Sequence, residues 1–276
     1  MTTRLAVLGS PIAHSKSPAL HRAAYGVLGL DWRYEAIEVA QAGLDGFLEG
    51  LDSAWRGLSL TMPLKREVLP ALTGRAPLVD EVGAANTVLL REGRREGFNT
   101  DVGGIITAFR EAGVEALESV QVLGAGATTA SVLSAVARLG ARRVTVSARD
   151  VVRAAALEPL AARLGIALTL RPLADSARPE ELPDAVVSTL PGGVDAGIAY
   201  PERVRRSAAL FDVAYDPWPS ALARQWQAAG GTVISGLSML LHQAVGQVRI
   251  FVAGDPDAEL PGEAAVVAAM RSAVGL

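Results

Sequence analysis

The sequence lacks the residues and segments that several classes of protein require. None of its 276 residues is cysteine, which excludes disulfides and thiolate metal sites. Its only histidines are His14, His21 and His242, so a histidine-built metal centre is not expected. No apolar run approaches the roughly 20 residues that a membrane helix needs, and no targeting peptide is evident. We therefore expect a soluble cytoplasmic protein without a metal.

An excess of charge is also missing. The chain has 26 Lys and Arg against 29 Asp and Glu, a formal net charge of -3. A nucleic-acid or anionic membrane surface requires a basic footprint, and this composition provides none. Half of the residues are hydrophobic, and the length is sufficient for one large or two smaller domains. Small molecules are therefore the expected partners.

A glycine-rich stretch in the middle of the chain carries the clearest local pattern. The apolar run 120–123 leads into Gly124 and Gly126, and a helical pattern then extends to about Leu139. A strand, a glycine turn and a helix start together present free N–H groups to a pyrophosphate. Thr129 stands where the third glycine of the usual GxGxxG pattern would be. The stretch thus predicts either a dinucleotide site or a structural strand–helix turn.

Alternating strands and helices follow this turn and predict a doubly wound parallel sheet, the Rossmann fold. The predicted strands are 143–147, 166–171, 185–190, 208–213 and 232–235, and the predicted helices are 151–164, 219–229 and 236–252. Arg149 lies where such a fold distinguishes the 2'-phosphate of NADP from the ribose hydroxyl of NAD, and arginine favours the phosphate. Asp150 opposes this because it would repel the phosphate or neutralise Arg149, although the two could also form a surface ion pair.

The first half of the chain has predicted strands at 4–8, 32–39 and 57–62, and polar residues follow the first and the third of them. Ser17 suits the N-cap of a helix, with Pro18 at its first position. Lys65 falls in the first turn of the helix after Pro63, where a cation opposes the helix dipole, which suggests a ligand or carboxylate partner.

A charged hairpin formed by 86–90 and 95–99 precedes a helix that begins near Asp101 and leads towards the glycine-rich strand. The Asp101 side chain is expected either to cap this helix or to take part in chemistry.

Seven motifs in order resemble the shikimate dehydrogenase family. They are Ser15-Lys-Ser17, Leu60-Thr-Met-Pro-Leu-Lys65, Gly83-Ala-Ala-Asn-Thr87, Asn99-Thr-Asp101, Gly124-Ala-Gly126, Asp212-Val-Ala-Tyr-Asp-Pro217 and Gly236-Leu-Ser-Met-Leu-Leu-His-Gln243. The resemblance implies an α/β substrate domain, residues 1–101 and 237–276, and a Rossmann NADP-binding domain, residues 102–236, with the active site in the cleft between them. It also implies reversible NADP-dependent reduction of 3-dehydroshikimate to shikimate, in the pathway to chorismate and the aromatic amino acids. A homodimer is a candidate assembly.

The resemblance also assigns roles to individual residues. Lys65 and Asp101 are the implied catalytic pair, with Lys65 protonating the substrate oxygen. The implied substrate-binding residues are Ser15, Ser17, Thr61, Lys65, Asn86, Asp101, Tyr215 and Gln243. The implied cofactor-binding residues are Gly124, Ala125, Gly126, Ala127, Thr128, Arg149, Val213, Gly236 and Met239.

Three departures from the family pattern leave alternatives open. Ala148-Arg149-Asp150 stands where Asn-Arg-Thr is common, Ser59 replaces an asparagine, and Ser188-Thr-Leu-Pro191 replaces Asn-Ala-Thr-Ser. Asp150 therefore keeps open an NAD-dependent quinate/shikimate dehydrogenase, although quinate-accepting relatives tend to carry threonine where this chain has Ser17. A non-catalytic shikimate-sensing module is the alternative from another class, which the intact Lys65 and Asp101 oppose.

Overall fold

The computed structural model describes residues 2–179 and 181–276 and contains two compact units. The first comprises residues 1–104 and 240–276, and the second comprises residues 105–239. The chain passes from one unit to the other within two helices, α5 (Asp101–Glu111) and α11 (Gly236–Ala253). The expected boundaries, after residue 101 and before residue 237, fall at the first residues of these helices.

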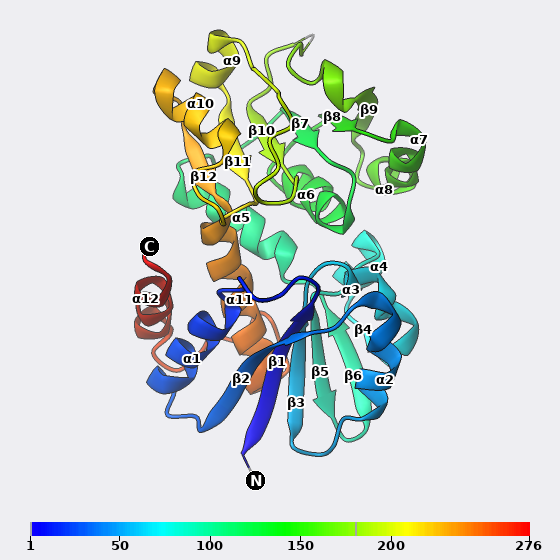
Figure 1. The fold of residues 1–276 in the computed structure, drawn as a ribbon, viewed down its shortest axis with the longest axis vertical. Helices are drawn as coiled ribbons and strands as arrows, with labels where there is room; N and C mark the ends of the chain where they lie inside the picture. Colours follow the sequence, from blue (N-terminus) through cyan, green and yellow to red (C-terminus); the bar gives the residue numbers. More distant parts are fainter. Residues whose placement is uncertain (1, 180) are drawn as a thin grey trace. The chain divides into compact units, whose positions relative to one another are not determined.

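The first unit is built on a six-stranded mixed sheet with the order β2-β1-β3-β5-β6-β4 (Figure 1). Its strands are β1 (Thr3–Gly9), β2 (Trp32–Glu38), β3 (Trp55–Leu60), β4 (Gly74–Arg75), β5 (Thr87–Arg91) and β6 (Arg94–Phe98). β1 pairs in parallel with β2 and β3, whereas β5 pairs antiparallel with β3 and forms the expected hairpin with β6. The predicted strands of this half are thus confirmed, with ends shifted by up to two residues.

Helices cover both faces of this sheet. On β1, Leu5 and Val7 join one buried cluster while Ala6 and Leu8 join another, as the two-residue period of a strand requires. The first cluster contains residues of α1 (Ser17–Val27), α11 and α12 (Glu263–Val274). The second contains residues of α2 (Leu44–Glu49), α3 (Leu64–Glu67) and α4 (Pro77–Val82). The C-terminal helices therefore complete the core of the N-terminal sheet.

The second unit is a six-stranded parallel sheet with the order β12-β11-β10-β7-β8-β9. Its strands are β7 (Ser119–Leu123), β8 (Arg143–Ala148), β9 (Ala167–Pro172), β10 (Ala185–Ser188), β11 (Ala209–Asp212) and β12 (Val233–Ser235). The winding direction reverses beside β7, because β8 lies on one side of it and β10 on the other. This is the topological switch point at which doubly wound sheets bind ligands, and it confirms the predicted Rossmann fold.

The helices of the second unit are α6 (Ala127–Arg138), α7 (Val151–Ala154), α8 (Glu158–Arg163), α9 (Glu202–Ser207) and α10 (Ala221–Ala229). The single helix predicted over 151–164 is wrong, since a 3₁₀ turn at Ala155–Leu157 separates α7 from α8. Pro159 stands at the start of α8 and has no N–H to continue a preceding helix. Among the described residues, no helix is long and apolar enough to cross a bilayer.

Candidate active site

Lys65 and Asp101 form a closely shielded ion pair in the first unit. Lys65 Nζ lies 2.7 Å from Asp101 Oδ2, and the two side chains are only 14% and 4% exposed. The Lys65 carbonyl accepts a 2.8 Å bond from Ala85 N–H, which fixes the backbone of α3 against the segment before β5. The carboxylate partner expected for a lysine at a helix start is therefore Asp101.

Asp101 opens α5 without capping it, so the capping alternative is wrong and the chemical alternative stays a prediction. Asn99 provides the cap, because its Oδ1 accepts from Val102 N–H at 3.3 Å. The Asn99 amide also donates to Ala84 O at 3.0 Å. Since Asn99 satisfies the helix start, both oxygens of Asp101 are available, one to Lys65 and the other to Asn86.

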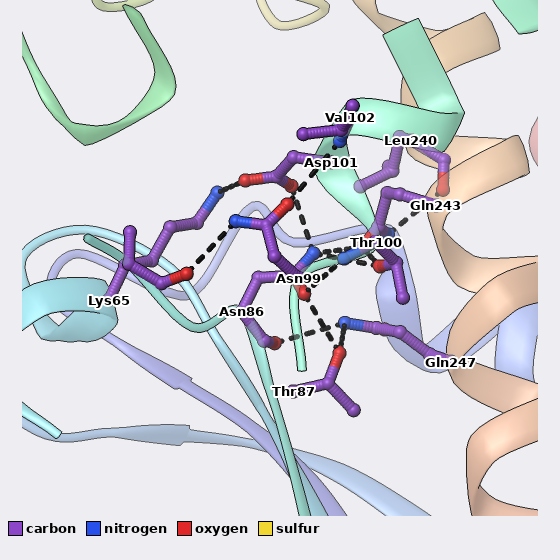
Figure 2. Close-up of polar contacts among 11 residues, drawn as sticks. Lys65, Asn86, Thr87, Asn99, Thr100, Asp101, Val102, Leu240, Gln243 and Gln247 are labelled. Carbon is purple, nitrogen blue, oxygen red and sulfur yellow. Dashed lines mark hydrogen bonds and ion pairs between the residues drawn. The ribbon is translucent and has the colours of Figure 1, made fainter. Parts of the chain in front are cut away.

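Asn86 lies at the centre of this polar cluster (Figure 2). It precedes β5 and is only 1% exposed. Its Nδ2 lies 2.9 Å from Asp101 Oδ1, 2.8 Å from Thr100 Oγ1 and 3.2 Å from Gln243 Oε1. An amide nitrogen has two hydrogens, so three acceptors compete for them, and a bound ligand could replace one acceptor without leaving a buried donor unsatisfied.

Gln243 reaches the cluster from α11. It is buried, and its Nε2 donates to Leu240 O of the same helix at 3.0 Å. The structure thus brings together four predicted site residues, Lys65, Asn86, Asp101 and Gln243, from four separate parts of the chain.

Thr61 directly follows β3, and Ser15 and Ser17 lie where the loop after β1 enters α1. A Cβ on Gly9 would lie 2.4 Å from Thr61 Cγ2, so the glycine allows the two strand ends to approach closely. Ser15 Oγ accepts from Ser17 N–H at 3.3 Å. Ser17 is the first residue of α1 rather than its N-cap, which corrects the prediction, because Lys16 occupies the cap position.

The glycine-rich turn joins β7 to α6 in the second unit. Gly124 has φ +104°, and a Cβ there would lie 2.4 Å from Thr189 Oγ1, so only glycine fits. Thr129, in place of the third glycine, is buried and its hydroxyl donates to Gly124 O at 3.1 Å. Thr189 in turn donates to Leu123 O at 2.8 Å. The two threonines therefore tie the turn to the neighbouring strand.

This turn fits a dinucleotide. Gly126 is the N-cap of α6 and has no side chain to occupy the N–H groups of the first turn, which contains Ala127 and Thr128. A Cβ on Gly126 would meet nothing within 4 Å, so the space in front of the helix is open. Free N–H groups at the positive end of a helix at the switch point are suited to a pyrophosphate.

Arg149 and Asp150 follow β8, and both are exposed. The Asp150 carboxylate caps α7 by accepting from Arg153 N–H at 2.9 Å. Its negative charge is therefore directed at the positive end of its own helix, which reduces its expected opposition to a phosphate at Arg149.

Val213 and Gly236 lie in contact at the ends of β11 and β12. A Cβ on Gly236 would lie 2.0 Å from Val213 O, so this close approach requires glycine. Met239 is buried on the next turn of α11. Tyr215 is half-buried in the loop after β11, in the second unit.

Asp212 precedes Val213 and anchors this loop. Its Oδ2 accepts from Ser220 Oγ at 2.5 Å and its Oδ1 from Ala214 N–H at 3.2 Å. Burial raises the pKa of the Asp212 carboxyl, an effect that these hydrogen bonds partly offset. In the part of the chain that the structure describes, no group of His, Cys, Asp and Glu could hold a metal ion.

Several residues of the site were missed in the sequence. Asn99, Thr87 and Thr100 stand within the recognised motifs but had received no role. Gln247 lies four residues after Gln243 on α11, and this spacing puts both amides on one face of the helix. This four-residue spacing could have identified Gln247 as a site residue from the sequence.

One unit has a glycine-rich turn at the switch point of a parallel sheet, and the other has a shielded lysine–carboxylate pair. Together these features are typical of dinucleotide-dependent oxidoreductases. A family model, the shikimate dehydrogenase substrate binding domain, matches residues 7–88. The NADP(+) shikimate dehydrogenase of Natronomonas pharaonis is 35% identical over 274 residues, 97% of each chain. The chain therefore belongs to the shikimate dehydrogenase family.

Solved structures agree with this assignment. The shikimate dehydrogenase of Mycobacterium tuberculosis is 39% identical, with a TM-score of 0.84 over 98% of this chain and 99% of that one. The Thermus thermophilus shikimate 5-dehydrogenase in complex with NADP(H) and shikimate is 34% identical, with a TM-score of 0.79 over 99% of this chain and 100% of that one.

Proposed function

We propose that the chain catalyses the reversible NADP-dependent reduction of 3-dehydroshikimate to shikimate, in the pathway to chorismate and the aromatic amino acids. The observation that carries the proposal is the shielded Lys65–Asp101 pair, 2.7 Å apart, beside the buried Asn86 amide. A related structure with NADP(H) and shikimate supports the choice of both ligands.

Residues 1–101 and 237–276 form the substrate domain in this proposal, and residues 102–236 form the cofactor domain. Gly124, Ala125, Gly126, Ala127 and Thr128 hold the pyrophosphate, Arg149 holds the 2'-phosphate, and Val213, Gly236 and Met239 line the nicotinamide position. When bound, NADPH supplies the hydride.

Lys65 performs the proton transfer. Its ammonium donates a hydrogen bond to the substrate's keto oxygen and releases a proton to that oxygen as negative charge develops on it. Asp101 orients the ammonium through the 2.7 Å contact. In the reverse direction the lysine amine takes the proton from the hydroxyl of shikimate.

Hydroxyl and amide groups select the substrate. Ser15, Ser17, Thr61, Asn86, Tyr215 and Gln243 bind its carboxylate and hydroxyls. A site of this kind discriminates strongly, because a ligand that lacks one hydroxyl leaves a buried polar group unsatisfied.

An absorbance assay on the purified chain tests the function. We expect NADP⁺ reduction with shikimate, and much slower rates with quinate or with NAD⁺. Comparable rates with NAD⁺ or quinate would identify a quinate/shikimate dehydrogenase instead. Shikimate binding in a calorimeter without turnover on any pair of ligands would identify a sensing module.

We also propose that the protein acts in the cytoplasm and forms a homodimer. Light scattering during size-exclusion chromatography should give twice the mass of the chain. A monomer mass across micromolar concentrations would contradict the dimer.

A further inference from the structure

Asn86 accepts a hydrogen bond at its backbone carbonyl from Gln247, for which the described residues show no hydrogen bond to Lys65 or Asp101. We propose that Gln247, acting through Thr87, is a positioning residue that holds the Asn86 amide in the orientation the site requires. The inference rests on the proposed function, because it concerns how the same site binds shikimate.

Gln247 uses all of its hydrogen-bonding capacity inside the first unit. Its Nε2 donates to Asn86 O and to Thr87 Oγ1, both at 3.1 Å (Figure 2). Its Oε1 accepts from Ser59 Oγ at 2.8 Å and lies 3.1 Å from His21 Nε2. Gln247 is 1% exposed, so each of these bonds would be costly to lose.

The direction of each bond follows from the amide nitrogen. Thr87 Oγ1 receives a hydrogen from Gln247, so its own hydroxyl hydrogen is free to point to Asn86 Oδ1, 2.9 Å away. Thr100 N–H donates to the same oxygen at 2.9 Å. Two donors therefore hold Asn86 Oδ1, and Nδ2 is directed towards Asp101.

The far side of the network fixes Gln247 itself. Burial lowers the pKa of His21 to about 3, so the ring is neutral near pH 7. Gln247 Oε1 only accepts, so His21 Nε2 carries the hydrogen and Nδ1 accepts from Tyr25 O–H at 3.0 Å. The His21 ring is also stacked on the Tyr34 ring, with 3.9 Å between the ring centroids. The Tyr34 hydroxyl donates to Ser59 Oγ at 2.7 Å.

A reversed Asn86 amide would disable the site. Its carbonyl oxygen would then face the Asp101 carboxylate, and two acceptors would oppose each other without a hydrogen. The donor offered to Asp101, and to a hydroxyl of the substrate, would be lost. The network thus determines which end of Asn86 faces the ligand.

Three variants and one control test this role. Thr87→Val keeps the shape of the side chain but removes the hydroxyl that donates to Asn86, and Thr87→Ser retains that hydroxyl. Gln247→Glu keeps the shape but replaces the donor with an acceptor. Val266→Ala removes buried apolar contacts of α12 in the same unit, outside this hydrogen-bond network, and it controls for general loss of stability.

We expect Thr87→Val and Gln247→Glu to lower kcat/KM for shikimate about tenfold, with KM for NADP⁺ unchanged. The shikimate Kd, measured by calorimetry without cofactor, should rise by a similar factor. Thr87→Ser should return both values to within about twofold of the parent chain. Val266→Ala should lower Tm and leave kcat/KM unchanged.

Three results would overturn the proposal and can be told apart. If the parent chain turns over shikimate but Thr87→Val matches it, or if every variant including Val266→Ala loses activity in proportion to Tm, Gln247 and Thr87 are structural only. If the parent chain neither binds nor turns over shikimate, the proposed function fails, and the positioning role fails with it.

Discussion

The two units prepare their sites in opposite ways. In the first unit the candidate groups are side chains, Lys65, Asn86 and Asp101, and each is held by buried hydrogen bonds. In the second unit the candidate groups are backbone N–H donors at Gly126 and the start of α6, and they are available because side chains are absent. The first site should therefore be damaged by removing a polar group, and the second by adding an atom.

The largest effect should come from removing the polar pair of the first unit. Lys65→Ala should lower kcat at least about a thousandfold, because it removes the proton donor and leaves Asp101 without its cation. Circular dichroism should show an intact fold. Arg66→Ala, an exposed neighbour on α3, should leave kcat unchanged. Near-normal turnover of Lys65→Ala would contradict the mechanism.

Adding one methyl group should damage the second unit. Gly124→Ala would place Cβ 2.4 Å from Thr189 Oγ1 and strain a residue at φ +104°. We expect NADP⁺ affinity to fall about a hundredfold, because the turn must shift away from the pyrophosphate. Fluorescence titration with NADPH measures this.

Gly113→Ala is the matched control for strain alone. Gly113 lies in the same unit at φ +80°, and nothing lies within 4 Å of its added Cβ. It should lower Tm without changing NADPH affinity, and neither variant should alter shikimate affinity measured by calorimetry. Loss of shikimate binding in Gly124→Ala would show that the two sites are not prepared independently.

Arg149 is the exception in the second unit, because there a side chain should select the ligand. Arg149→Gln should raise KM for NADP⁺ about ten- to hundredfold and leave KM for NAD⁺ nearly unchanged, since a charged hydrogen bond to the 2'-phosphate is lost. Asp150→Asn keeps the cap of α7 and removes a negative charge, so KM for NADP⁺ should fall a few fold. An unchanged ratio of the two KM values in Arg149→Gln would reject the assignment.

The smallest effect concerns the pH dependence of stability in the first unit. Burial lowers the pKa of His21 from 6.5 to about 3, so between these values the unfolded chain binds a proton that the folded chain does not. The free energy of unfolding should therefore fall as the pH drops below 6.5, by about 2 kcal/mol between pH 7 and pH 5 from this group.

Urea unfolding of the parent chain and of His21→Phe at both pH values measures this contribution. The variant should be less stable at pH 7 but should lose about 2 kcal/mol less on acidification, because phenylalanine does not ionise. Equal losses in the two chains would show that His21 is not buried as a neutral ring.

The sequence predicted the second unit well because its pattern is local. Apolar runs, glycines and helical stripes alternate along residues 119–235, and each element forms largely from its own residues. The errors in this unit concern helices whose presence or ends do not follow from the apolar pattern alone. Helix α9 was missed because it is short and charged with only Val204 buried, and helix 151–164 was predicted as continuous across Pro159.

The sequence predicted which residues belong to the candidate site of the first unit, but not how their side chains are hydrogen-bonded to one another. Motif order supplied Lys65, Asn86, Asp101 and Gln243, and the unfavourable place of Lys65 at a helix start predicted a ligand or a carboxylate partner. Nothing local indicated that Asn99, rather than Asp101, would cap α5. Both residues are good caps, and the choice depends on which one β6 and the segment before β5 hold in place.

By itself the sequence determined the strands other than the two-residue β4, the parallel winding of the second unit and the identity of the reactive groups, because periodicity and residue type are properties of short segments. Only the tertiary structure decided which side chains form hydrogen bonds with one another. Asn86 meets Asp101 and Gln243 across separations of 15 and 157 residues, and Gln247 meets Asn86 across 161. The direction of a buried hydrogen bond depends on where β3, β5, α5 and α11 converge, and this convergence is fixed by packing the whole core of the unit.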